Sequence, residues 1–108
     1  MLVATRRVAV ALASLAAALA LAGSIDAREW PSPPSWWLNS NEMTCVRIRE
    51  SGNGRASSNL YGMMAGWSAA GGSGSAWRAT RAEQHWRAWL LWRRYGCHQP
   101  WGRYDHCC

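Results

Sequence analysis

Four cysteines in a chain of only 108 residues constrain the fold more than any other feature. Small domains bury a modest share of their surface and often need covalent cross-links. In an exported chain an even number of cysteines predicts two disulfides. A zinc site is the alternative, because Cys97-His98 and His106-Cys107-Cys108 are clustered, but this spacing matches no common zinc motif. We therefore expect no metal and no cofactor. The cysteines are Cys45, Cys97, Cys107 and Cys108.

Residues 1–27 have the pattern of a secretory signal peptide. Arg6 and Arg7 precede fifteen uncharged residues, 8–22, and small residues follow before the chain turns polar. This apolar run is shorter than the roughly 20 residues that span a bilayer. The alternative to a cleaved signal peptide is a retained N-terminal anchor. We expect cleavage after Ala27, and Ala22 is the other candidate site. The mature chain would then have 108 − 27 = 81 residues, be secreted, and have no stable membrane insertion.

The mature part carries a net positive charge. Residues 28–108 hold ten arginines and no lysine against five acidic residues, which gives 10 − 5 = +5. Outside a cell such a surface meets anionic polymers, such as wall polysaccharides, teichoic acids or a membrane surface. Nucleic acid is not an expected partner for an exported chain, and a GC-rich genome would also raise the arginine content without any function.

Two helices flank a middle region of mixed character. Residues 28–38 are rich in proline and predict an extended lead-in before a domain at 39–108. A first helix is expected from Ser40 to Glu50, with Asn39 as its N-cap and Glu42 completing a capping box. Its core face carries Met43 and Val46, widened by Cys45 and Ile48.

The last helix has the clearest boundaries. Thr80 and Glu83 form a capping-box pattern, residues 81–95 follow, and Gly96 ends the helix. Between the helices a short hairpin at 60–64, a helical turn around 67–70 and a loop at 71–74 are expected. The fold class is therefore α+β, mainly α. Met63, Met64 and three tryptophans of the last helix should be core: Trp86, Trp89 and Trp92.

Glu50 lies where a surface helix rarely places an acid. It follows Met43 and Val46 on one face and directly precedes Ser51-Gly52-Asn53-Gly54. Desolvation at the edge of an apolar face raises the pKa of a carboxyl, and helix C-terminal carbonyls also disfavour the anion. The carboxyl would then stay protonated and could act as a general acid. The alternative is a solvated carboxylate or a salt bridge to an arginine.

Several short motifs occur in a recognisable order. They are Cys45 before Glu50-Ser51-Gly52-Asn53, then Leu60-Tyr61-Gly62, a Trp and a Gly-Gly pair, Ala82-Glu83-Gln84, and Pro100-Trp101 before a terminal cysteine. This order resembles the transglycosylase-like, lysozyme-like domain of secreted actinobacterial cell-wall enzymes, the group of the resuscitation-promoting factors. The resemblance covers roughly residues 36–107.

The resemblance implies a small lysozyme-like domain, cross-linked by disulfides, around a groove for peptidoglycan glycan strands. In such a domain the Glu50 position is the general acid that cleaves the β-1,4 bond between N-acetylmuramic acid and N-acetylglucosamine. It also implies a Cys45–Cys107 disulfide, which leaves Cys97 and Cys108 as a second pair. We expect a secreted, wall-associated monomer. One departure is Ala65, at or near a position where many members of the family have a glutamine that helps to hold the sugar.

Five residues are candidates for sugar contact. Tyr61 is the aromatic residue that the resemblance places in the groove, and Trp67 and Trp77 are the tryptophans of the Gly-rich middle region. Asn53 and Asn59 could donate to N-acetyl groups, although Asn beside Gly is typical of turns.

No second carboxylate is a convincing catalytic partner. Glycosidases usually place two carboxyls roughly 5–9.5 Å apart. Glu42, however, lies near the far end of its helix, Glu83 caps a helix, and Asp105 lies in the tail, where we expect it to pair with an arginine. A single acid suits a transglycosylase that forms a 1,6-anhydro product, and a substrate-assisted hydrolase stays open. The alternatives to an enzyme are a non-catalytic wall-binding or antimicrobial Trp/Arg-rich module and a disulfide-rich interaction protein of the envelope.

Overall fold

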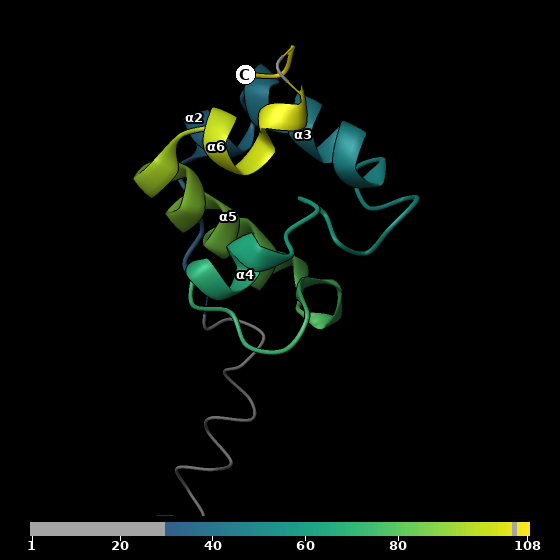
Figure 1. Ribbon diagram of the computed structural model, residues 1–108, viewed down its shortest axis with the longest axis vertical. Coiled ribbons are helices and arrows are strands. Elements are labelled where there is room, and N and C mark those ends of the chain that lie inside the picture. The colour runs from purple at the N-terminus through teal and green to yellow at the C-terminus, as the bar shows by residue number, and fades with distance from the viewer. Residues whose placement is uncertain (1–29, 105) are drawn as a thin grey trace, which may run out of the picture.

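The computed structural model describes residues 30–104 and 106–108. The expected signal peptide and its cleavage site lie outside these residues, as does Asp105. The described chain is mainly helical and contains no strand, so the expected hairpin at residues 60–64 does not form and the α+β label is not confirmed. The elements are α2 (Ser35–Leu38), α3 (Asn41–Ser51), α4 (Ala65–Ala69), the 3-10 helix η2 (Ala76–Arg78), α5 (Arg81–Tyr95), α6 (His98–Trp101) and the 3-10 helix η3 (Gly102–Tyr104). Figure 1 labels the α-helices.

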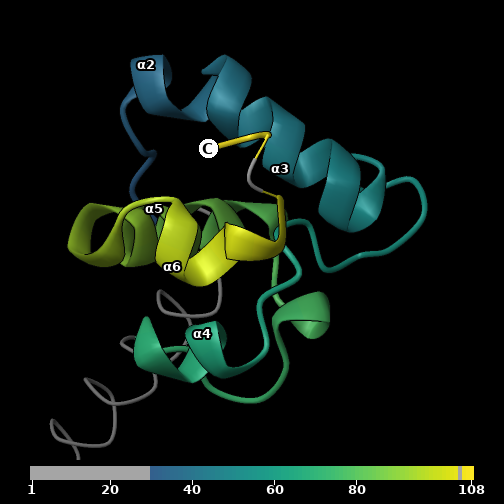
Figure 2. The same ribbon diagram turned by 45° about the horizontal axis from the view of Figure 1, so that its top comes forward.

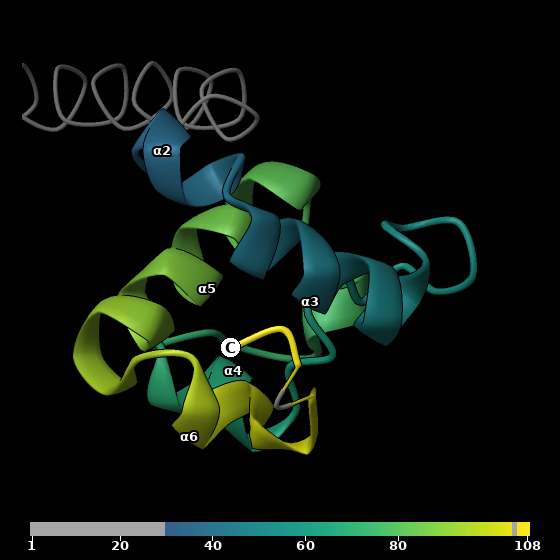
Figure 3. The same ribbon diagram turned by 90° about the horizontal axis from the view of Figure 1, so that it is seen from above.

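The helices form three tiers around α5 (Figure 2). The first tier is the α2–α3 pair, the second is α5 with α6, and the third is α4 with η2. Helix α5 packs against both α4 and α6. After η3 the chain rises toward α3, so the C-terminus lies close to that helix (Figures 2 and 3).

Helix α5 has the predicted boundaries. The Thr80 hydroxyl accepts a hydrogen bond from the Glu83 backbone N–H at 3.2 Å, and Gly96 is the C-cap. Glu83 also forms an ion pair with Arg87, whose Nε lies 2.7 Å from the carboxylate. These local interactions explain why sequence signals alone located this helix.

Helix α3 differs from the prediction at its start. Ser40, not Asn39, is the N-cap, because its hydroxyl accepts from the Met43 backbone N–H at 3.1 Å. Glu42 therefore completes no capping box, and its carboxylate instead accepts a hydrogen bond from Trp92 Nε1 at 2.7 Å. The helix ends at Gly52, whose left-handed backbone (φ 62°) closes the last turn.

Residues 30–34 of the proline-rich lead-in form no helix. Ser35–Leu38 form α2, which was not expected, and Trp37 at 1% exposure belongs to the core. Trp37 stacks on Tyr61 with ring centroids 6.2 Å apart and meets Trp89 at 5.4 Å. Aromatic burial thus draws the end of the lead-in onto the domain.

The core face of α3 is not the predicted one throughout. Met43 and Val46 are fully buried as expected, but Ile48 is 53% exposed. Arg47 is buried in its place, with hydrogen bonds to the Tyr61 hydroxyl and the Leu38 carbonyl. Met63 is core, as expected, whereas Met64 is 68% exposed. Trp89 is buried, and Trp86 and Trp92 are partly buried against the core.

Two disulfides cross-link the described residues. Cys45 pairs with Cys107 and Cys97 pairs with Cys108, which are the pairings that the resemblance implied. The first joins α3 to the tail across a sequence separation of 62 residues. Closing a loop of that length stabilises the fold by about 4 kcal/mol in the chain-entropy account. Together the disulfides hold η3 and the last residues near α3.

Candidate active site

Glu50 lies in the last turn of α3 and packs directly on Gly62. A Cβ atom added at residue 62 would overlap the Glu50 carboxylate, so only glycine fits beneath it. Gly62 also has φ +61°, a backbone conformation that residues with a side chain rarely adopt. The Tyr61-Gly62 step is therefore shaped both by its own turn and by the acid above it.

The end of α3 and the segment before Gly62 are joined through Ser51. Its hydroxyl lies 3.0 Å from the Arg47 carbonyl and 2.9 Å from the Leu60 carbonyl, and it accepts from the Gly54 N–H at 3.0 Å. Ser51 is buried at 1% exposure. Because one side chain contacts both segments, the position of Glu50 relative to Gly62 is set by the fold.

Burial raises the pKa of the Glu50 carboxyl above its ordinary value, and the Arg103 guanidinium partly opposes this rise. The carboxyl is half-buried, as expected for an acid at the edge of an apolar face. Arg103 belongs to η3, the segment that the disulfides hold near α3. A desolvated carboxyl in this setting keeps its proton at a higher pH than an exposed one does.

A pocket of about 450 Å³ opens beside Gly62 between α4, α5 and α6. Its lining is mostly apolar, and the side chains of Tyr95 and Gln99 supply polar groups. Glu50 itself does not line this pocket, but Gly62, on which its carboxyl packs, does. Ala65, which the resemblance puts at or near the position of a glutamine, contributes only a methyl group. The lining residues are Gly62, Met63, Met64, Ala65, Gly66, Ala69, Leu91, Tyr95, Gln99, Pro100 and Trp101.

A second pocket of about 330 Å³ shares three of these residues: Met63, Met64 and Ala65. It extends from them to Trp77, which is 44% exposed. The two pockets therefore meet along one short segment, and Trp77 is the accessible aromatic ring at the far side of the second. Two of the five residues predicted to contact sugar, Trp67 and Trp77, line this second pocket.

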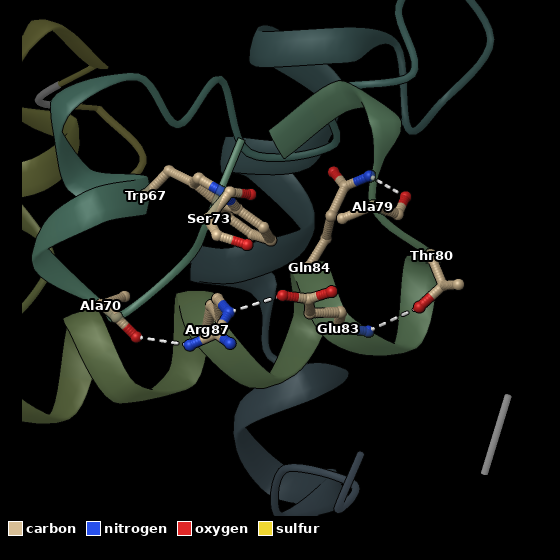
Figure 4. Close-up of polar contacts among 8 residues, drawn as sticks. All are labelled: Trp67, Ala70, Ser73, Ala79, Thr80, Glu83, Gln84 and Arg87. Atoms are coloured by element: carbon tan, nitrogen blue, oxygen red, sulfur yellow. Dashed lines mark hydrogen bonds and ion pairs between the residues drawn. The ribbon is translucent and has the colours of Figure 1, made fainter. Parts of the chain in front are cut away.

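Three of those five residues are buried and are used inside the fold. Asn59 bonds the Met63 backbone twice, with its Oδ1 accepting from the N–H and its Nδ2 donating to the carbonyl, both at 3.0 Å. Trp67 is 2% exposed and donates from Nε1 to the Ser73 carbonyl at 3.0 Å (Figure 4). Neither side chain presents a free surface to a sugar. Both were predicted to contact sugar, because residue type alone does not indicate whether a side chain is buried.

Tyr61 is fully buried, so its ring cannot line a groove as the resemblance implied. Its hydroxyl accepts from Arg47 Nη1 at 3.1 Å and lies 2.6 Å from His85 Nδ1. Since an arginine can only donate, the hydroxyl hydrogen remains for His85. The carbonyl of Tyr61 accepts from Trp101 Nε1 at 2.8 Å. Tyr61 thus supports the turn that ends at Gly62.

Asn53 is exposed in the turn after Glu50, with a left-handed backbone at φ 57°. Its N–H donates to the Arg47 carbonyl at 3.0 Å, so the backbone closes the end of α3. Of the candidates for sugar contact, Asn53 and Trp77 are therefore the exposed ones.

The other described acids have partners away from Glu50. Glu42 accepts from Trp92 Nε1, and Glu83 is paired with Arg87, which also donates to the Ala70 carbonyl (Figure 4). Within residues 30–104 and 106–108 the site thus contains one candidate general acid and no second carboxylate beside it.

The histidine and cysteine residues of the tail do not form a ready metal site. Cys45, His106 and Cys107 bring their ligand atoms within 4.8 Å of one another, but both sulfurs belong to one disulfide and cannot act as thiolate ligands. The disulfides are typical of proteins outside the reducing cytoplasm. No helix in the described part of the chain is long and apolar enough to cross a membrane.

Comparisons with known proteins found no relative of this chain. No known protein family matches the chain, and neither a search of curated proteins nor a search of solved structures found a match. Membership of the lysozyme-like family therefore stays a prediction from the motifs.

The sequence patterns did not single out three residues: Gly62, on which Glu50 packs; Arg103, whose charge lowers the pKa of Glu50; and Gln99, which lines the pocket beside Gly62. The Tyr61-Gly62 motif was noted, and a glycine after a buried tyrosine is a signal of close packing. Arg103 and Gln99 carry no such signal, because only the disulfides and the path of the tail bring them close.

Proposed function

We propose that this chain is a secreted enzyme that cleaves the β-1,4 bond between N-acetylmuramic acid and N-acetylglucosamine in peptidoglycan, with Glu50 as the general acid. The observation that carries the proposal is the setting of the Glu50 carboxyl: half-buried and packed on Gly62, which lines a pocket of about 450 Å³. The motif order from Cys45 to Cys107 supports the same assignment.

In the proposed reaction the protonated Glu50 carboxyl donates its proton to the glycosidic oxygen. The bond between that oxygen and the anomeric carbon breaks, and the leaving sugar departs as a neutral alcohol. The raised pKa of Glu50 keeps the proton available at a higher pH than for an exposed glutamate. After the transfer the carboxylate can act as the base that deprotonates the attacking hydroxyl.

The attacking group would come from the substrate or from water. With no second carboxylate beside Glu50 among the described residues, attack by the 6-hydroxyl of the muramic acid sugar needs no protein nucleophile. That route yields a 1,6-anhydro end, whereas attack by water yields a reducing end, and the two products differ in mass by one water.

The experiment is digestion of purified peptidoglycan by the native chain and by Glu50→Gln, with mass spectrometry of the released fragments. We expect fragments from the native chain and none above background from Glu50→Gln. Glu83→Gln is the matched control, because it makes the same chemical change in the first turn of α5, where the acid only pairs with Arg87. Equal release by the native chain and Glu50→Gln would exclude the catalytic role.

A second candidate function is binding to the cell wall, or antimicrobial binding, without cleavage. It is favoured by the few polar groups of the pocket, where Ala65 stands at the position of the family glutamine. It predicts retention on intact wall sacculi that weakens with salt, without release of soluble fragments, because exposed arginines would supply the attraction.

A further inference from the structure

A rigid tryptophan stands on the surface away from Glu50. Trp36, on α2, is 63% exposed although it belongs to an aromatic cluster. Its ring meets Trp89 at 5.7 Å and Trp92 at 6.0 Å, at interplanar angles of 85° and 69°. Trp89 and Trp92 in turn stack on each other at 5.7 Å. The cluster fixes the ring of Trp36 while leaving most of its surface in solvent.

Polar groups contact the two rings that Trp36 meets. The Arg93 guanidinium lies 5.8 Å from the centre of the Trp89 ring, which Trp36 also contacts. Glu42 holds the indole of Trp92, the other ring that Trp36 meets, through one carboxylate oxygen at 2.7 Å. The second oxygen of Glu42 has no hydrogen bond among the described residues. We call Trp36, Trp89, Trp92, Arg93 and Glu42 the Trp36 platform.

We infer that the Trp36 platform is a carbohydrate-binding surface that holds a glycan strand outside the cleavage site. One face of a pyranose ring consists of C–H groups and packs on an exposed aromatic ring, while its hydroxyls bond to carboxylate and guanidinium groups at the rim. Because the ring of Trp36 is already immobilised, binding loses little side-chain entropy.

An anionic membrane is a poorer fit for this surface. Recognition of anionic lipid typically uses clusters of about 4–8 basic residues. Here one arginine, Arg93, and one acid, Glu42, contact the cluster, and the next arginine, Arg94, lies over the ring of Tyr95 at 5.4 Å. A single fixed indole with one acidic and one basic neighbour suits a neutral sugar better.

The platform lies apart from the proposed cleavage site. Glu42 and Glu50 are eight residues apart on α3, which is roughly 12 Å along a helix axis. A strand bound at Trp36 would therefore raise retention of the enzyme on its polymer without contacting the acid. The inference rests on the proposed function only for its choice of polymer.

The test measures binding by the full chain carrying Glu50→Gln, so that no polymer is cleaved. The probes are insoluble chitin, an uncharged N-acetylglucosamine polymer, and phosphatidylglycerol vesicles. Adding Trp36→Ala should weaken binding to chitin at least about fivefold, the scale of an aromatic contact. Trp36→Phe should keep most of the binding to chitin. The weaker binding of Trp36→Ala should persist at high salt. Ile48→Ala is the matched control, because Ile48 is an apolar residue of similar exposure outside the platform.

Equal binding of chitin by the Trp36→Ala and unaltered forms would overturn the inference, as would binding to vesicles but not to chitin. Near-ultraviolet circular dichroism checks whether Trp36→Ala disturbs the cluster. If it does, Arg93→Gln and Trp36→Phe replace it in the binding test. Unchanged binding by Arg93→Gln together with lost binding by Trp36→Phe would then contradict the inference of a sugar-binding surface. Turnover is measured separately with the native Glu50. Equal turnover by the native chain and Glu50→Gln would remove the proposed enzyme and leave this binding result standing.

Discussion

The C-terminal end of α3 and the N-terminal end of α5 both carry a glutamate, and the two are used in opposite ways. At the start of α5, Glu83 lies in the first turn, where the helix dipole favours an anion, and its carboxylate is paired with Arg87 (Figure 4). At the end of α3, Glu50 lies in the last turn, packed on Gly62, with a pKa raised by burial.

The difference shows that position in the fold decides what a carboxyl does. Polar groups at the start of α5 are satisfied within the fold: Gln84, for example, accepts from the Leu60 N–H at 2.8 Å and donates to the carbonyls of Ser58 and Ala79. At the end of α3 the hydrogen bonds instead involve the Ser51 hydroxyl and the backbone of the turn that follows. Glu50 is left in a setting that favours its neutral form, which is a setting that stability alone would not select.

Turnover gives the largest expected difference between the two acids. A general acid contributes roughly 10²- to 10⁴-fold, so Glu50→Gln should lower the rate of fragment release by that factor. Glu83→Gln should stay within about twofold, because this partly buried pair lies away from Glu50 and i,i+4 pairs on a helix contribute little. Initial rates on solubilised peptidoglycan fragments check this. Similar losses in both variants would show that the comparison reflects folding and not chemistry.

Removing the space beneath Glu50 should have the next largest effect. Gly62→Ala forces a Cβ into the carboxylate at a positive φ, and we expect about 2–4 kcal/mol of lost unfolding free energy. Gly74→Ala is the control, since Gly74 has a similar φ of +64° and open space around it, and should cost about 1 kcal/mol. Urea unfolding gives both values.

A double variant separates the overlap from backbone strain. In Glu50→Ala/Gly62→Ala the carboxyl is absent, so the cost of the alanine at residue 62 should fall toward that of Gly74→Ala. If Gly62→Ala costs the same with and without the Glu50 carboxyl, the two residues are not in contact as described.

Acid should weaken the fold through His85, in the second turn of α5. Burial, with the charges of Arg47 and Arg81, lowers the pKa of His85 from 6.5 to about 4. The unfolded chain therefore binds a proton more readily, so the contribution of neutral His85 is full above pH 6.5 and is lost as the pH falls toward 4. His85→Gln should flatten the unfolding free energy over this range. An unchanged slope in thermal melts across these pH values would contradict the assignment.

The smallest predicted effects have opposite signs for the two acids. Because the folded-state pKa of Glu50 is raised, the native chain should lose stability relative to Glu50→Gln as the pH rises above the ordinary value of 4.5. At neutral pH Glu50→Gln should thus gain a few tenths of a kcal/mol, since solvent screens a half-exposed group. Glu83→Gln should lose about 0.5 kcal/mol with its ion pair. Paired denaturant titrations give the two signs, and a loss in both would remove the contrast.

Features with strong local signals were predictable. The whole of α5 followed from Thr80, Glu83 and Gly96, because capping and termination are interactions within a few residues. Helix α3 was found with its N-cap shifted by one residue, since Asn39 and Ser40 are both good caps and only the contact with Met43 N–H distinguishes them. The raised pKa of Glu50 was predicted because an acid between an apolar helix face and a glycine-rich break is itself a local pattern.

The failures involve contacts between distant segments. Ile48 was expected in the core, but Arg47 is buried there because the Tyr61 hydroxyl and the Leu38 carbonyl accept its hydrogen bonds. Tyr61 and Trp67 were expected at a sugar groove, yet both are buried. Their exposure depends on which segments cover them, and residue type does not contain that information.

The amino-acid sequence by itself determined the mainly helical class, the boundaries of the last helix, the need for cross-links and the acid at the end of α3, because each follows from local propensity, spacing or composition. Only the tertiary structure decided what surrounds that acid. Gly62, the pocket beside it and the arginine of η3 are brought to Glu50 by a core of aromatic rings and two disulfides. Desolvation and charge act through space, so the environment of one carboxyl depends on chain segments that lie far from it in the sequence.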